Sequence, residues 1–322
     1  MTSERQTLGV FARRWLEEVA RPSVRPKTLQ FYAGMLRLHI IPSLDRRPLA
    51  KVSPQGLQAL YGQKLKEGLS PRTVGHIHRV LHKVFQDALN WGLLGRNPCA
   101  AVRPPKVQVQ EIRTLSPDDA RHFLAVADDH PHHALYVLAI TAGLRQGELL
   151  GLKWPDVDLD AGRLRVQRTI QRIKGGGFIE GEPKSASSRR SITLTKMAVT
   201  ALKRHRAMQL EARMKALVWE ENSLLFPNEI GRPIEATNLL RRSFFPLLER
   251  AGLQRLRFHD LRHTAATLLL AEGIHPKVVQ EMLGHSAVSL TLDTYSHVVP
   301  DLQREAAEKM QALLEPPRAD AI

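Results

Sequence analysis

Residues 259–295 read HDLRHTAATLLLAEGIHPKVVQEMLGHSAVSLTLDTY, and they gather histidines, an arginine and a tyrosine into fewer than forty positions. On a helix, His259 and Arg262 are three residues apart and share a face. Gly284-His285 is expected to end a helix, and Tyr295 is expected on the helix that follows. Imidazole, guanidinium and phenol groups gathered in this way can hold a phosphate and attack it.

The spacing of His259 and His263 allows a different interpretation. Two histidines one helical turn apart are typical of the zinc-protease helix, but that chemistry needs a glutamate directly after the first histidine, and Asp260 stands there. A buried histidine or tyrosine that is hydrogen-bonded to the backbone is the ordinary structural alternative for each residue. We therefore expect no metal site here.

A second stretch, Thr141-Ala-Gly-Leu-Arg-Gln-Gly-Glu148, lies far upstream. Gly143 breaks the helical pattern, and Arg145 and Glu148 then fall three apart, which predicts that they share one face of the next helix. A carboxylate beside a guanidinium fixes its planar fork, so the arginine meets a phosphate already aligned. An ion pair on the surface is the structural alternative.

The pattern between residues 163 and 194 is that of strands. Polar and apolar residues alternate over 163–173 and again over 190–194, and Gly175-Gly-Gly177 predicts a turn. These features predict a small antiparallel sheet. Its connection carries Lys184 near a turn, where the side chain can reach into a cleft, although a solvated loop lysine is the ordinary alternative.

The positive charge is concentrated in the first third of the chain. Residues 1–106 hold 18 Lys+Arg against 6 Asp+Glu, whereas the whole chain of 322 residues has a formal net charge of +15. A surplus this concentrated suits a surface that follows phosphates, so we favour nucleic acid over an acidic protein or an anionic membrane as the partner. The basic residues of helical segments also have an ordinary alternative as exposed helix faces; the candidate DNA contacts are Arg72, Arg79, Lys83, Arg241 and Arg242.

Cysteine content and hydropathy indicate the cellular compartment in which the protein is expected. The single cysteine, Cys99, cannot form an internal disulfide, which fits a reducing environment. No stretch approaches the roughly 18 apolar residues that a membrane helix needs. We therefore expect a cytoplasmic protein without a membrane contact.

The first third of the chain reads as helical. Ser53-Pro54, Ser70-Pro71 and Thr28 mark helix starts, because Ser or Thr caps free N–H groups and Pro is tolerated in the first turn. The predicted helices span residues 7–20, 28–40, 53–67 and 71–91, and further helices are predicted at 117–129, 132–142, 195–215 and 235–251. A basic stretch without periodicity predicts an extended linker, so we expect domains at 1–98 and 113–322 joined by residues 99–112.

Taken together, these residues make the chain resemble the tyrosine recombinase (phage integrase) family. The resemblance rests on six positions in order, Arg145, Lys184, His259-x-x-Arg262, Leu283-Gly-His285 and Tyr295. It implies a mainly α fold, with an N-terminal four-helix core-binding (SAM-like) domain. The implied catalytic domain is mainly helical with a small antiparallel three-stranded sheet.

The resemblance also implies a mechanism without ATP, metal or cofactor. Tyr295 attacks the scissile phosphate to form a 3'-phosphotyrosyl link, and Lys184 protonates the leaving 5' oxygen. The supporting roles fall to Arg145 and Arg262 as a phosphate clamp, His285 as a hydrogen-bond donor, His259 in proton transfer, and Glu148 as support for Arg145 and His259. The implied partner is a double-stranded DNA recombination site, on which free monomers form a homotetramer through a helix at 301–314.

Two other functions share parts of this pattern. A type IB topoisomerase uses the tyrosine, arginines and lysine, but Gly284-His285 and the short helical N-terminal domain favour a recombinase. An inactive DNA-binding regulator could retain the fold, and the presence of all six residues argues against it.

Overall fold

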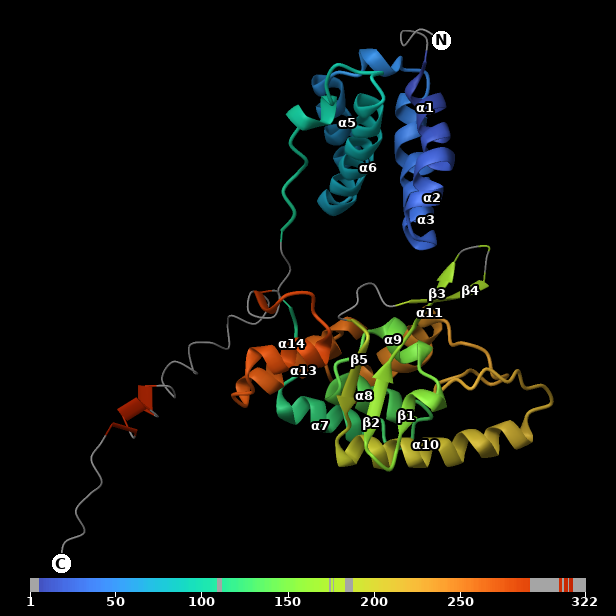
Figure 1. The fold of residues 1–322 in the computed structure, drawn as a ribbon, viewed down its shortest axis with the longest axis vertical. Coiled ribbons are helices and arrows are strands. Elements are labelled where there is room, and N and C mark those ends of the chain that lie inside the picture. Colours follow the sequence, from blue (N-terminus) through green and yellow to red (C-terminus); the bar gives the residue numbers. More distant parts are fainter. Residues whose placement is uncertain are drawn as a thin grey trace, which may run out of the picture. The chain divides into compact units, whose positions relative to one another are not determined.

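The computed structural model describes residues 6–108, 112–173, 175, 177–182, 188–289, 307–308, 310–311 and 313–314. The chain forms two compact units (Figure 1). One consists of Met1–Gln110 with Ile173–Gly175, and the other of Glu111–Arg172 with Gly176–Ile322. Each unit has its own hydrophobic core.

The first unit is helical. Two of its helices contain a turn of wider π-helical geometry, which divides each of them into two named α segments. In order, the elements are α1 (Leu8–Trp15), a π turn (Leu16–Ala20), α2 (Arg21–Ser23), α3 (Pro26–Met35), a π turn (Leu36–Ile40), α4 (Ile41–Leu44), α5 (Pro54–Lys66) and α6 (Pro71–Asn90), with short 3-10 turns at Leu49–Lys51 and Pro98–Ala101.

Two of the three predicted helix starts, at Ser53 and Ser70, are confirmed. The Ser53 hydroxyl accepts the Gly56 N–H at 3.1 Å, and the Ser70 hydroxyl accepts the Thr73 N–H at 3.2 Å, so both serines cap the helices that follow. The start at Thr28 is wrong, because α3 begins at Pro26. Proline supplies the helical φ at the first position and lacks the N–H that would have no partner there.

The first core extends into the predicted linker. Cys99 and Val102 are buried in it, and Pro98–Ala101 forms a 3-10 turn rather than an extended chain. The prediction that residues 99–112 form an extended linker is therefore wrong for residues 99–102, because two apolar side chains of this part are buried in the core. Deeper in the core, the Trp15 indole donates to the buried Asp87 carboxylate at 2.7 Å.

The second unit combines helices with two small sheets. Its helices are α7 (Pro117–Val126), α8 (His133–Thr141), α9 (Gln146–Gly151), α10 (Lys196–Lys215), α11 (Ala236–Leu239), α12 (Phe245–Arg250), α13 (Phe258–Ala271) and α14 (Pro276–Leu283), with a 3-10 turn at Trp154–Asp156 and a π turn at Leu240–Phe244. Its strands are β1 (Val157–Asp158), β2 (Arg163–Val166), β3 (Thr169–Ile173), β4 (Gly177–Gly181) and β5 (Arg190–Thr193).

The sheets confirm the predicted class and correct its detail. Strands β1, β2 and β5 form an antiparallel three-stranded sheet in that order, with Leu164 opposite Ile192. The prediction of one strand over 163–173 is wrong, because the chain leaves this sheet after β2. Arg168, at the break, forms ion pairs with the buried Asp156 and with Glu180. Strands β3 and β4 then form a separate two-stranded sheet.

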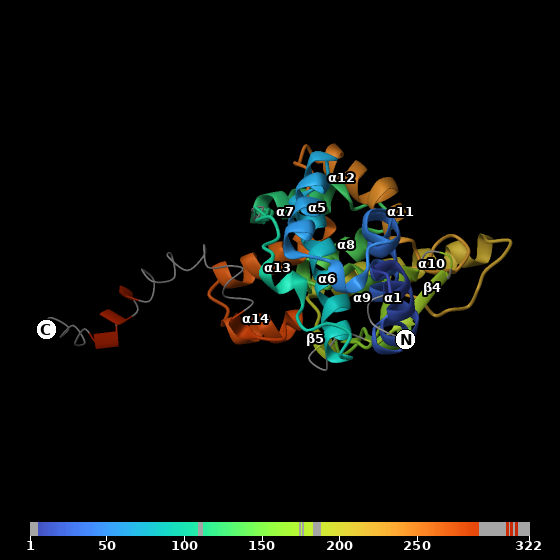
Figure 2. The ribbon, with the colours of Figure 1, turned by 90° about the horizontal axis from the view of Figure 1, so that it is seen from above.

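Helix α8 lies at the centre of the second core. Its residues from Ala134 to Ile140 are all buried, as expected of a helix that is apolar on every side, and it packs against α10 and α13. In both views the C-terminal end of α10 and the chain after it, residues 216–235, extend to one side of this unit (Figures 1 and 2). Because α8 leads into Gly143 and α13 carries Arg262, this packing fixes the candidate site.

Among the residues that the structure describes, no helix combines the length and the apolar character that a membrane crossing needs.

Candidate active site

Arg145 and Glu148 form the start of α9. The Arg145 N–H donates to Glu148 Oε2 at 3.0 Å, and Arg145 Nη1 donates to Glu148 Oε1 at 2.7 Å. The predicted contact is present, but its predicted geometry is wrong: Arg145 precedes the helix in extended conformation, with φ −69° and ψ 148°. Glu148 therefore caps the helix and holds the arginine side chain at the same time.

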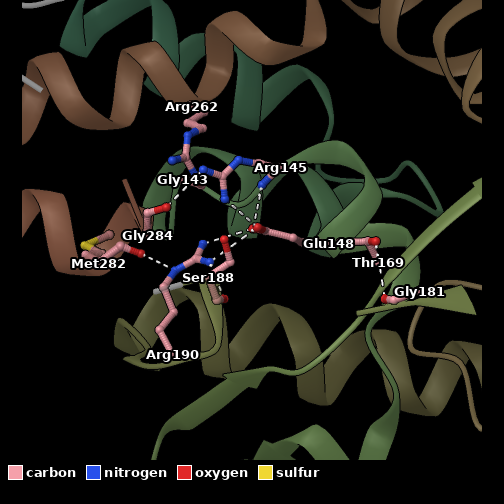
Figure 3. A network of polar contacts seen from close by, with 10 residues as sticks. All are labelled: Gly143, Arg145, Glu148, Thr169, Gly181, Ser188, Arg190, Arg262, Met282 and Gly284. Atoms are coloured by element: carbon pink, nitrogen blue, oxygen red, sulfur yellow. Dashed lines mark hydrogen bonds and ion pairs between the residues drawn. The ribbon is translucent and has the colours of Figure 1, made fainter. Parts of the chain in front are cut away.

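A second arginine, Arg190 at the start of β5, binds the same carboxylate. Its Nη2 donates to Glu148 Oε2 at 3.0 Å, and its Nε donates to the Met282 carbonyl at 2.6 Å (Figure 3). Burial acts to raise the pKa of Glu148, but the charges and hydrogen bonds of Arg190 and Arg145 outweigh it and lower that pKa. Glu148 is therefore held ionised. Arg190 was not predicted as a site residue, and its only signal in the sequence is its place at the head of a predicted strand.

Arg262 approaches from α13. It is only 2% exposed, and its Nη1 donates to the Gly143 carbonyl at 2.8 Å. Arg145 likewise donates to a glycine carbonyl on a distant segment: its Nη2 lies 3.0 Å from the Gly284 carbonyl oxygen (Figure 3). Gly143 and Gly284 have φ values of 59° and 68°, which favour glycine. Two left-handed turns thus present the carbonyls that orient the two arginines.

Three histidines lie close in the sequence to the groups that the arginines contact or belong to: His259 and His263 are on α13 with Arg262, and His285 follows Gly284. Partial burial, followed by the charges of Arg262 and Arg145, lowers the pKa of His285 to about 4. Partial burial, followed by His263 and the two arginines, lowers the pKa of His259 to about 4 as well. Arg145 donates to the carbonyl of Gly284, directly before His285. Arg262 donates to the carbonyl of Gly143, two residues before Arg145, and lies one helical turn after His259 on α13. The four side chains therefore share one neighbourhood. His285 is only 8% exposed. The His259 residue is exposed as a whole, but its ring packs edge-on against the His263 ring, with 4.9 Å between the ring centres, so the ring is partly covered.

The structure therefore brings together Arg145, Glu148, His259, Arg262 and His285 of the predicted set. Lys184 and Tyr295 lie outside the described residues, as does most of the predicted helix at 301–314. Among the described residues no cluster of histidine, cysteine and carboxylate side chains fits a metal ion.

The predicted DNA contacts lie on two surfaces. Arg72 and Arg79 are exposed on α6, and Arg79 contacts the His76 ring at 2.6 Å. Lys83 is paired with Asp87 at 3.0 Å, so its charge is partly balanced. Arg241 and Arg242 are exposed on the π turn between α11 and α12.

The candidate active site does not coincide with a large cavity of the second unit. A cavity of about 1260 Å³ in the second unit is lined by β3 and β4, α10 and residues 219–235. Its lining includes none of Arg145, Glu148, His259, Arg262 and His285. The small polar site is instead defined by converging arginines and histidines.

Two family models match the chain. Residues 113–301 match the phage integrase family, and residues 7–65 match the phage integrase N-terminal SAM-like domain. A "Tyrosine recombinase XerC-like" protein of Caldanaerobacter subterraneus subsp. tengcongensis is 35% identical over 95% of this chain and 83% of its own length. The ICEBs1 integrase of Bacillus subtilis is 25% identical over 90% of this chain and 79% of its own length.

Solved structures share the fold. The Tn1549 transposon integrase in complex with a circular intermediate DNA has a TM-score of 0.79 and 23% identity, and the match covers 94% of this chain and 99% of that one. A lambda integrase tetramer bound to a Holliday junction has a TM-score of 0.66 and 21% identity, over 91% of this chain and 78% of that one.

Proposed function

Because the chain belongs to the phage integrase family of tyrosine recombinases, we propose that it cuts and rejoins DNA at a specific site through a 3'-phosphotyrosyl intermediate. The observation that carries the proposal is the convergence of Arg145, His259, Arg262 and His285, which the contacts of the two arginines with the Gly284 and Gly143 carbonyls establish. Arg145 lies more than a hundred residues before the other three side chains in the sequence.

Cleavage begins with the phenol of Tyr295. Its oxygen forms a bond to the scissile phosphorus while the bond from phosphorus to the 5' oxygen breaks. The Lys184 ammonium gives a proton to that leaving oxygen, and His259 takes the proton of the phenol. In the rejoining step, the 5'-hydroxyl of a partner strand attacks the same phosphorus and releases Tyr295. The phosphodiester energy is kept in the tyrosyl link, so no ATP is consumed.

The arginines stabilise the transition state. Arg145 and Arg262 donate to the non-bridging oxygens, where negative charge develops, and His285 donates a further hydrogen bond. Removal of one such preorganised donor costs about 3 kcal/mol of transition-state stabilisation. A bound phosphate also offsets the arginine charges and thereby raises the pKa of His259 and His285 above its value of about 4 in the free protein.

The partner is a duplex recombination site. A lambda integrase of the same fold binds a Holliday junction as a tetramer. We extend this arrangement to the present chain, as monomers in solution that become a homotetramer on DNA and act in the cytoplasm. Met310 and Leu313, in the described part of the tail, are exposed and helical, which suits a helix that docks on a neighbouring subunit.

The test uses the Tyr295→Phe variant and a nicked suicide substrate made from the site that footprinting locates beside the gene. A nick near the cleaved bond lets the short 5'-hydroxyl fragment leave, so the wild-type protein should accumulate a covalent adduct that survives denaturation. The variant should bind the DNA with unchanged affinity and form no adduct, because it lacks the nucleophile. Denaturing gels measure the adduct, and Tyr32→Phe is the matched control. A phenylalanine variant that still forms an adduct, or a wild-type protein that forms none, contradicts the proposal.

A further inference from the structure

Arg190 and Arg145 both contact the Glu148 carboxylate, but they differ in exposure (Figure 3). Its side chain is 6% exposed, whereas that of Arg145 is 34% exposed. DNA can therefore reach Arg145 but not Arg190. An effect of Arg190 on the reaction must pass through the groups that it contacts.

The first of these groups is the Glu148 carboxylate. Each of its oxygens accepts from both arginines. The Arg190 guanidinium donates at 3.0 and 3.4 Å, whereas Arg145 donates from its guanidinium at 2.7 Å and from its backbone N–H at 3.0 Å. One buried carboxylate thus serves two cations. Without Arg190, Glu148 would keep only the partly exposed Arg145 as a cationic partner, and the carboxylate would take up a proton more readily. A neutral Glu148 would hold the Arg145 fork less firmly.

The second group is the end of α14. Arg190 Nε donates to the Met282 carbonyl at 2.6 Å, two residues before Gly284, which accepts from Arg145. The last carbonyls of a helix have no partner within the helix and carry partial negative charge, so a guanidinium there is stabilising. Two arginines therefore fix the turn from which His285 projects.

The third group is the Ser188 carbonyl, which accepts from Arg190 Nη1 at 3.1 Å. Strand β5 begins at Arg190 and pairs with β2, where Arg190 lies opposite Val166. Arg190 thus also fixes the chain at the start of β5.

We propose that Arg190 is a positioning residue for strand cleavage: through Glu148 and Met282 it holds Arg145 and the turn at His285 in one arrangement. This inference rests on the proposed function, because it concerns the same phosphate. It adds a buried group that never touches DNA.

The first experiment measures single-turnover cleavage of the suicide substrate at saturating DNA. Arg190→Met keeps much of the side-chain volume and removes the charge and the donors. We expect cleavage about 10²-fold slower, the effect of a misplacement near 1 Å, with DNA affinity within about threefold of wild type. The cleavage rate of Arg190→Lys should lie between those of the wild type and Arg190→Met, because lysine keeps the charge but not the planar fork. The matched control is Arg189→Met, since Arg189 is exposed and pairs only with the exposed Glu182 in the described part of the chain.

The second experiment measures the titration of Glu148 by carbon NMR of labelled glutamate, assigned with Glu148→Gln. The carboxylate should titrate at higher pH in Arg190→Met than in the wild type. The cleavage rate of Arg190→Met should therefore fall more steeply on acidification than that of the wild type. The steeper fall should disappear when Glu148→Gln is added. Simple loosening of the fold would not produce this dependence on residue 148.

The outcomes separate the two proposals. A wild type that forms no adduct removes the proposed function, while the NMR titration still tests the link between Arg190 and Glu148. Arg190→Met that cleaves at the wild-type rate, or a Glu148 titration that does not move, overturns the role of Arg190 alone. If melting curves show that Arg190→Met does not fold, Arg190→Lys decides the question: unchanged cleavage overturns the proposal, and slower cleavage with a low Glu148 pKa supports it.

Discussion

At the scale of single residues, the site consists of arginines that protein acceptors orient in advance. Arg145 spends one N–H on Glu148 and one on the Gly284 carbonyl, and within the described residues its other donors remain available to a phosphate. Arg262 is held by the Gly143 carbonyl. Fixed donors lose little freedom when the transition state forms, which is why such groups contribute strongly to catalysis.

The histidines make the stability of the protein dependent on pH. The pKa of His132, His259 and His285 is lowered to about 4, from an ordinary value of 6.5. Between these values the unfolded chain binds more protons than the folded one, so stability is complete above about pH 6.5 and falls as the pH drops toward 4. We expect urea unfolding midpoints to decrease over this window, and to decrease less in His285→Gln. Equal pH dependence in the variant and the wild type would contradict this assignment.

Most of the described site residues could be predicted from the sequence, but Arg190, which holds Glu148 in place, could not. Spacing predicted the contact between Arg145 and Glu148, yet a separation of three residues fits both a helix face and a helix cap, and the cap is what forms. Arg190 could not be predicted, because arginines are mostly exposed and only the fold brings β5 next to α9 and the end of α14. The other site residues were predicted from the order in which the motif residues follow one another along the chain.

At the scale of elements, α8 and α14 end near each other in left-handed glycines. A Cβ on Gly143 would lie 2.3 Å from Leu283 Cδ2 and 3.4 Å from Ala265 Cβ, in addition to the strain of φ 59°. We expect Gly143→Ala to lower the free energy of unfolding by about 2–4 kcal/mol, the sum of backbone strain and overpacking. Strand cleavage should fall too, since the Gly143 carbonyl orients Arg262. Chemical denaturation and the suicide substrate measure the two effects.

Gly273→Ala is the control that isolates the contact with Leu283. Gly273 also has a left-handed φ, 72°, but a Cβ there would meet nothing within 4 Å. Only the backbone term of about 1 kcal/mol should remain, and cleavage should not change. Equal losses of stability in the two variants would show that the close approach of α14 is not what requires glycine at position 143.

The predicted elements were most accurate where capping chemistry is local. Ser53 and Ser70 each mark a helix start, because a hydroxyl followed by proline satisfies the first turn. The π turns at Leu16–Ala20, Leu36–Ile40 and Leu240–Phe244 could not be predicted, since one wider turn barely changes an apolar pattern. Strand β4 was missed because its glycines indicated a turn, and its pairing with β3 depends on the chain around it.

At the scale of the molecule, charge and chemistry are divided between the two units. Most of the positive surplus lies in the first 106 residues, whereas the converging arginines and histidines belong to the second unit. The first unit can therefore supply affinity for the phosphate backbone without entering the reaction. Phosphate contacts position a protein on the duplex, and base contacts add the sequence preference.

This division predicts how binding responds to salt. Arg72 and Arg79 are exposed on α6, and each phosphate that they neutralise releases counterions when DNA binds. Replacing both by alanine should weaken binding and reduce the slope of log K against log salt by about 2, with little change in single-turnover cleavage at saturating DNA. Fluorescence anisotropy with a labelled duplex at several salt concentrations gives the slope. Arg204→Ala is the matched control, because Arg204 lies on the second unit and pairs with Asp128 and Asp129. If the double variant keeps the wild-type slope while Arg204→Ala reduces it, the DNA backbone follows a different surface from the one that the charge distribution indicates.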